Sequence, residues 1–478
     1  MASDSVNARH LLRRGVPVRY LNSGVMPLVC ALMTGALLLQ DQGVAESNSA
    51  SAPDDRIDRA RVTEQPLPEI RATKTAPPQV IHRISQRASE VPCSENSWNA
   101  AQQSIRKGLD FLLATQDSSG GWRVWTGSKG TDQRDRSLAA STAITALVLK
   151  ALAQAGEVPT RSAAAMRARD YIRGRMGGTG RSFQPDPQGG LGNYVASAVA
   201  SALASIQDPE DQVLLRTSVK WLTIHQWDQT EGVSPRMDWF GGSGYGRSGR
   251  PDLSNTQMML DALHDAGVTA DDPAVQRALV FLTRTQNLPS TNAAAWAQSG
   301  SADGGFVYTP AYGGESFASE AAGEGRCGEK VAVGQPRSLR SYGSMTYAGF
   351  KSLLYAGLSK DDPRVRAAFE WIRRHWTFAE NPGLGLQGLF YYRHALSRAL
   401  SAAGEDMITD AQGSPHNWRD ELVSALVSSQ AANGSWINSA SRWDEGDAEL
   451  CTAYAVLALE EAIKPAQRAA PTTSASTP

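Results

Sequence analysis

The sequence predicts an all-α protein whose helices close into a double ring, an (α/α)6 barrel or toroid. Amphipathic helices with one apolar stripe recur along the chain. Each is followed by a glycine-rich stretch and by a helix that is apolar on most sides and rich in Ala, Ser and Thr. A helix that is apolar on most sides is buried on most sides, so the second kind is expected to form an inner ring and the first kind to wrap it. An open solenoid of the same repeats is the alternative.

The outer helices carry the clearest repeat. Ala266 and Ala356 each begin an Ala-Gly pair that is followed, at the same spacing, by Asp-Asp-Pro and an apolar i, i+4, i+7 stripe. Asp272 and Asp362 can accept hydrogen bonds from free N–H groups of the first turn, and the proline after each needs no N–H there. Outer helices are therefore predicted to begin near Gln102, Arg161, Pro209, Pro273, Pro363 and Trp418.

The inner helices are predicted over the less charged segment that follows each outer helix. Their apolar residues lie on most sides, with small residues between them, which is typical of helices packed against several neighbours. These segments are Ser137–Ala153, Gly192–Ser205, Leu253–Asp265, Tyr342–Ala356, Gly388–Ala402 and Asp447–Glu461.

The two ends of the chain are predicted to lie outside the ring. In residues 1–45, a basic start, a short apolar run and small residues at the end indicate a signal peptide, so we expect export to the periplasm or cell envelope. Residues 46–92 and 464–478 are rich in Pro, Ser and Ala without an apolar period, as disordered segments are. The toroid is thus predicted over residues 93–463, with a glycine-rich insertion at 287–340.

The composition restricts the partners and cofactors. A net charge of -1 over 478 residues argues against nucleic-acid binding, which needs a basic face. The four cysteines have no zinc-site spacing, so we expect no metal and no cofactor. Cys93 and Cys327 leave a disulfide open, and the sequence decides neither the oligomeric state nor a peripheral association with membranes.

Two turns at the ends of outer helices share one pattern. Gln116 to Trp122 and Gln430 to Trp436 both fit Q-x-x-x-G-x-W, and Gln286 begins a broken form that continues at Asp303. A glycine after a helix can take a positive φ, the glutamine amide can bond backbone groups of the adjoining turn, and the tryptophan can cover the helix junction.

This pattern resembles the QW repeats of squalene and oxidosqualene cyclases, over roughly Gln102 to Glu461. Within that superfamily the chain is similar to bacterial prenyltransferase and squalene oxidase repeat proteins. The resemblance implies a terpenoid cyclase-like and protein prenyltransferase-like toroid, with a central pocket entered where the inner helices begin. The D-x-D-D acid of the cyclases is absent, and the zinc-binding D-x-C of the prenyltransferases is absent from Tyr342–Phe350.

Candidate site residues therefore come from the starts of the inner helices. His394 lies three residues after Tyr391 and can share its helix face, so we expect it to act as an acid/base tuned by Asp447 or Glu445, the alternative being a structural polar cluster. Aromatic and polar side chains over an apolar funnel suit an apolar ligand with a polar end. The expected ligand-binding residues are Tyr391, Tyr392, Tyr342, Asn255, Asp252 and Trp443.

Several roles follow from these residues and stay open. The first is the binding, with or without transformation, of an apolar isoprenoid-like ligand; an enzyme of this kind would be terpenoid cyclase-like or prenyltransferase-like. The second is a non-catalytic exported binding or interaction protein that uses the toroid as a scaffold. The third is a carbohydrate-acting α/α barrel. An apolar pocket with a buried acid would favour the first role, and an apolar pocket without one would favour the second. An open acidic cleft would favour the third.

Overall fold

The computed structural model describes residues 93–122, 131–176, 183–186, 190–246, 249–314, 316–323, 327 and 339–465. The predicted signal peptide and linker, residues 1–92, lie outside the described residues, as does most of the predicted tail. No helix of the described chain is long and apolar enough to cross a membrane.

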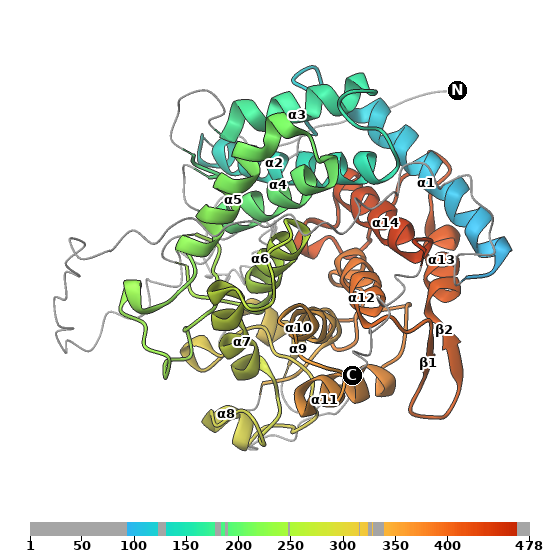
Figure 1. Cartoon of the computed structure of the whole chain (residues 1–478). Helices are drawn as coiled ribbons and strands as arrows, with labels where there is room; N and C mark the ends of the chain where they lie inside the picture. The colour runs from blue at the N-terminus through green and yellow to red at the C-terminus, as the bar shows by residue number, and fades with distance from the viewer. Residues whose placement is uncertain are drawn as a thin grey trace, which may run out of the picture.

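The less charged helices form a closed inner ring, as predicted (Figure 1). Each contacts the next along the ring, and the last, α14, contacts the first, α2, which excludes the open solenoid. Every residue of Gly192–Leu203 in α4 is buried, in agreement with its apolar character on most sides. The inner helices are α2 (Thr131–Gln154), α4 (Gly192–Ile206), α6 (Leu253–Asp265), α10 (Gly343–Tyr355), α12 (Leu389–Ala403) and α14 (Ala448–Ala462).

The amphipathic helices wrap this ring. Asp272 accepts a hydrogen bond from the Ala274 N–H at 2.8 Å, and Asp362 accepts one from the Arg364 N–H at 2.9 Å, so both predicted N-caps are confirmed. The outer helices are α1 (Glu95–Thr115), α3 (Ala163–Met176), α5 (Gln212–Ile224), α7 (Pro273–Thr285), α11 (Pro363–Arg374) and α13 (Trp418–Ser429).

A glutamine at the end of an outer helix ties that helix to the next one. Gln430 Nε2 donates to the Gly434 carbonyl of its own turn at 2.9 Å and to the Ser104 carbonyl of α1 at 3.0 Å. This contact joins the sixth outer helix to the first. The same pair of bonds recurs from Gln116 to Gly120 and Ala164, from Gln226 to Gly241 and Ala274, and from Gln286 to Gly304 and Arg364.

The linear sequence pattern does not predict the turn that begins at Gln226. Its partner Gly241 follows only after the short helix η6 (Gln229–Glu231), so the linear pattern is interrupted although the contacts are the same. In the predicted insertion, Phe306 replaces tryptophan, and its N–H bonds Thr346 Oγ1 at 3.1 Å, as the Trp436 N–H bonds Thr452 Oγ1 at 3.0 Å.

The ring also carries short helices and strands that were not predicted. They are η5 (Pro209–Asp211), α8 (Ala295–Gln298), η7 (Ala311–Gly314), α9 (Phe317–Ala322), β1 (Met407–Thr409), its antiparallel partner β2 (Pro415–Asn417) and η8 (Arg442–Asp444).

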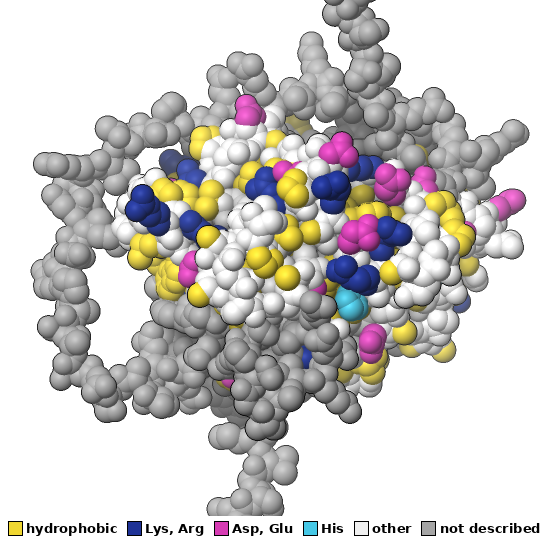
Figure 2. Space-filling view, turned by 90° about the horizontal axis from the view of Figure 1, so that it is seen from below, with side chains coloured by type: hydrophobic (Ala, Val, Ile, Leu, Met, Phe, Trp, Pro, Cys, Tyr) yellow, Lys and Arg dark blue, Asp and Glu magenta, His cyan; other side chains and the backbone are white. Residues whose placement is uncertain are grey.

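The free cysteines include Cys93 and Cys327, so the disulfide that the sequence left undecided is not formed. On the face shown in Figure 2, basic and acidic side chains are mixed, and neither sign of charge forms a patch of its own.

Candidate functional site

A pocket lies where the inner helices begin. Tyr342 and Gly388 are the N-caps of α10 and α12, and Ser254 stands in the first turn of α6. The pocket holds about 370 Å³ of empty space, counting the part open to solvent. Aromatic side chains dominate its wall. The lining residues are Tyr194, Tyr245, Ser254, Tyr308, Tyr342, Ser344, Met345, Asn381, Leu384, Gly388, Tyr391 and Trp443.

Three tyrosine hydroxyls in the wall are bonded to neighbouring hydroxyl groups. Tyr245 and Tyr308 share a hydrogen bond at 3.1 Å between their hydroxyl oxygens, and the Tyr194 hydroxyl bonds to Ser254. The rings of Tyr194 and Tyr245 stack with centroids 5.5 Å apart. With these hydroxyls partnered, the wall offers mostly ring faces, which suit an apolar ligand. We name this site, with the lining residues given above, the tyrosine pocket.

Asp252 is a buried acid behind the wall. Its carboxylate caps α6 by accepting hydrogen bonds from the backbone N–H and the side-chain amide of Asn255, each at 2.8 Å. Burial raises the pKa of Asp252 to about 6, against the hydrogen bonds from Asn255 and from the Tyr308 hydroxyl, which lower it. Asp252 and Asn255 therefore support the wall without lining the pocket.

Glu445 and Asp447 also hold inner helices by their first turns. Glu445 Oε1 accepts the Tyr391 N–H at 2.8 Å, and Asp447 Oδ1 accepts the Leu450 N–H at 2.9 Å. Helix N-termini favour such carboxylates. Burial nevertheless raises the pKa of each group to about 7. Their position is that of caps for α12 and α14.

His394 is not paired with Asp447 or Glu445, which corrects the expected acid/base pair. Its ring is mostly buried and stacks on Tyr454 with centroids 5.5 Å apart. Burial, followed by the charges of Arg398, Lys150 and Lys351, holds the pKa of His394 well below its usual value. The ring is therefore neutral and faces a cluster of cations rather than the carboxylates at the helix starts.

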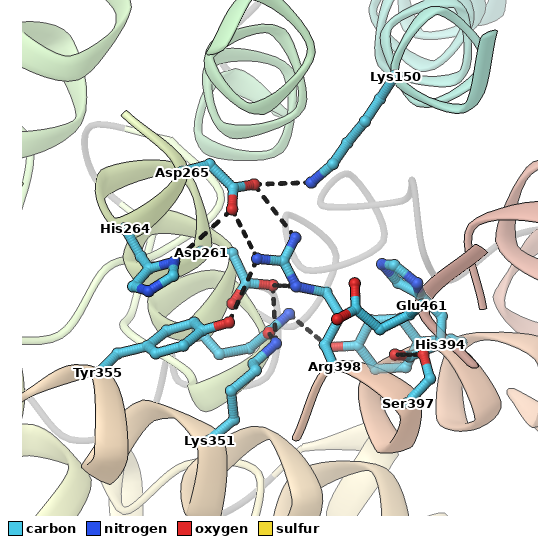
Figure 3. Close-up of polar contacts among 12 residues, drawn as sticks. Lys150, Asp261, His264, Asp265, Lys351, Tyr355, His394, Ser397, Arg398 and Glu461 are labelled. Atoms are coloured by element: carbon cyan, nitrogen blue, oxygen red, sulfur yellow. Dashed lines mark hydrogen bonds and ion pairs between the residues drawn. The ribbon is translucent and has the colours of Figure 1, made fainter. Parts of the chain in front are cut away.

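Charged side chains of four inner helices meet inside the ring (Figure 3). Asp265 accepts bonds from Lys150 Nζ at 2.7 Å and Arg398 Nη2 at 2.8 Å, and Asp261 accepts one from Lys351 Nζ at 2.7 Å. These five side chains, which we name the charged cluster, come from α2, α6, α10 and α12 and are mostly buried. None of the five is among the predicted site residues, although charged residues on otherwise apolar inner helices are a signal in the sequence.

The remaining predicted ligand-binding residues divide into two groups. Tyr391, Tyr342 and Trp443 line the tyrosine pocket, as expected. Tyr392 faces the outer layer, where its hydroxyl donates to the Thr377 carbonyl at 2.7 Å, so its expected place in the pocket is not what the structure shows. The wall residues Tyr245 and Tyr308 were not among the predicted ones, because they come from a loop and from the insertion.

Trp443 has an unusual backbone for a pocket residue. Trp443 has φ 67° and Asp444 has φ 60°, in the left-handed region that favours glycine. Strain of this kind, held at the rim of a pocket, often accompanies a functional role.

Among the described residues, no group of three or more His, Cys, Asp or Glu side chains could hold a metal ion.

Residues 95–309 match the family model of the squalene-hopene cyclase C-terminal domain. The protein is squalene cyclase-like. No curated protein matches the sequence significantly.

The solved structures to which the chain is similar are distant in sequence. The type II terpene cyclase MstE from Scytonema has 14% identity and a TM-score of 0.44, covering 76% of this chain and 99% of that chain. A variant of MstE in complex with geranylgeranyl dihydroxybenzoate has the same identity and TM-score, with 78% and 99% covered. An inactive variant of an α-1,6-mannanase of Salegentibacter sp. HEL1_6, bound to α-1,6-mannotriose, has 10% identity and a TM-score of 0.48, with 76% and 98% covered.

Proposed function

We propose that the protein binds an apolar isoprenoid-like molecule in the tyrosine pocket. The observation that carries this proposal is a wall of tyrosine ring faces at the end of a squalene cyclase-like ring where the inner helices begin. The empty space of about 370 Å³ includes open solvent, and its enclosed part is small. A bound ligand is therefore short or extends out of the pocket. With the export predicted from residues 1–45, we place this role in the cell envelope.

The carboxyl groups near the pocket are suited neither to alkene protonation nor to sugar hydrolysis, which favours ligand binding as the role of the site. Protonation of an alkene needs an unusually strong acid, whereas burial raises the pKa of Asp252 to about 6. Sugar hydrolysis needs two carboxyl groups that flank the substrate. Asp252, Glu445 and Asp447 instead cap three different helices, and none of them lines the pocket.

Filling the pocket is expected to weaken ligand binding. Leu384 lines the pocket from the loop before α12, so Leu384→Trp places a larger side chain in the binding space. We expect the affinity for farnesol, measured by native mass spectrometry or calorimetry, to fall about tenfold or more, since lost apolar contacts of 1.4 kcal/mol give a factor of ten. Leu386→Trp is the matched control, because Leu386 lies in the same loop but is 46% exposed and outside the wall. Unchanged binding by Leu384→Trp would contradict the proposal.

A further inference from the structure

We propose that the charged cluster fixes the Tyr391 hydroxyl as a hydrogen-bond donor to the ligand. The inference rests on the proposed binding function and narrows the ligand class to isoprenoid-like molecules that carry an oxygen acceptor. An ether, ester, carbonyl or alcohol oxygen would satisfy this requirement, whereas a pure hydrocarbon would leave the donor without a partner.

Tyr391 lines the tyrosine pocket. Its side chain starts on α12 and reaches the inner helix α6, which α10 separates from α12 in the ring; there Gln257 Nε2 donates to the Tyr391 hydroxyl oxygen at 2.9 Å. Both side chains are buried. The Tyr391–Gln257 pair therefore lies between the pocket and the charged cluster.

The orientation of the Gln257 amide follows from its other neighbour. Lys351 Nζ lies 2.9 Å from Gln257 Oε1 and 2.7 Å from Asp261 Oδ2. An ammonium group has donors and no acceptor, so it must face the carbonyl oxygen of the amide. The amide NH₂ then points at Tyr391 and donates to it. Burial lowers the pKa of Lys351 to about 8, with Asp261 opposing the shift, so the ammonium form prevails at neutral pH.

The hydrogen bond from Gln257 determines what the hydroxyl hydrogen of Tyr391 can bind. Since the oxygen already accepts from Gln257, this hydrogen is available for another acceptor, and the tyrosine lines the pocket. The hydrogen bond from Gln257 is the one that Tyr391 Oη makes within the described part of the chain. A bound oxygen atom is therefore the natural partner of this donor.

The rest of the charged cluster holds Lys351 and Asp261 in place. Arg398 Nε lies 3.8 Å from Asp261 Oδ2, and Arg398 is itself bonded to Asp265. If the cluster served packing alone, apolar side chains of similar volume would often serve as well, since buried ion pairs give little net stability. Gln257 and Lys351 act through Tyr391, so we regard them as positioning residues.

The test compares three probes that share one chain: farnesyl methyl ether, which only accepts, farnesol, which also donates, and β-farnesene, which does neither. We expect the natural protein to bind the ether about three- to tenfold more tightly than β-farnesene, the effect of one hydrogen bond. Gln257→Glu keeps the shape but presents a carboxylate to Tyr391, which must then donate to it. This variant should lose the preference for the ether over β-farnesene and bind farnesol more tightly than the ether.

Two conservative variants complete the experiment. Tyr391→Phe should bind the ether and β-farnesene equally well, while Tyr392→Phe, on the other side of α12, should keep the natural ratio. Thermal unfolding of each variant shows that it is folded. Equal affinity of the natural protein for the ether and β-farnesene, or an unchanged order in Gln257→Glu, would overturn the inference alone. Failure of all three probes to bind the natural protein would overturn the proposed function and the inference with it.

Discussion

Asp265→Ala is expected to lower the free energy of unfolding by roughly 3–5 kcal/mol, because it removes the carboxylate bonded to buried Lys150 and leaves Arg398 only the more distant Asp261. Asp265 accepts from Lys150 at 2.7 Å and from Arg398 at 2.8 Å. Lys150 is 5% exposed and Arg398 is 9% exposed, so water cannot replace the lost carboxylate. Urea unfolding followed by circular dichroism measures the change.

An exposed ion pair of this chain provides the control. Lys360 and Glu405 are bonded at the surface, where their side chains are 54% and 46% exposed. Glu405→Ala should change the unfolding free energy by less than about 1 kcal/mol. Similar losses in Glu405→Ala and Asp265→Ala would contradict the view that burial makes the charged cluster sensitive.

The same carboxylate gives a pH dependence with a defined sign. Burial alone would raise the pKa of Asp265, but Arg398 and Lys150 hold it well below the usual carboxyl value. A depressed pKa contributes stability that is present above the unfolded pKa and is lost as the pH falls through the folded pKa. The difference between the natural protein and Asp265→Ala should therefore be largest near neutral pH and shrink in acid.

Gly434→Ala is expected to weaken the closure of the ring. Gly434 has φ 88°, and an added Cβ would lie 2.2 Å from the Lys107 carbonyl oxygen of α1. The left-handed backbone costs about 1–2 kcal/mol for a residue with a Cβ. Relief of the overlap adds about 1–3 kcal/mol, the usual cost of overpacking. The unfolding free energy and the amide exchange rates of α1 both report this loss.

Gly413→Ala is the matched control for this substitution. Gly413 has φ 87°, but nothing lies within 4 Å of its added Cβ. It should lose the backbone part alone, about 1–2 kcal/mol, without faster amide exchange in α1. Equal losses of unfolding free energy in Gly413→Ala and Gly434→Ala would mean that α1 shifts away from the added Cβ without an energetic cost. The contact between Gly434 and α1 would then not hold the ring closed.

Most of the fold could be predicted from local pattern. The Asp-Pro starts of α7 and α11 satisfy free N–H groups within a few residues, and the burial of α4 is visible in its apolar residues on most sides. The contact between Gln226 and Gly241 could not be predicted, since an intervening short helix hides the spacing while the three-dimensional arrangement restores it.

Local sequence pattern predicted less of the candidate functional site. Tyr391 and Tyr342 lie in the tyrosine pocket because they stand where inner helices begin. His394 has a helical position near that of Tyr391, but it lies about 4.5 Å further along the axis at 1.5 Å per residue. That step carries it past the pocket and toward the cations of the charged cluster.

The pattern of apolar, capping and small residues was enough to determine a toroid of paired helices, because those preferences act within a few turns of one helix. Tertiary structure alone decided which side chains meet across the ring. Lys150, Asp265 and Arg398 come from three inner helices, and Gln257 meets Tyr391 over a gap of 134 residues. Contacts between such distant positions depend on the relative rotation and depth of whole helices, which no local spacing records.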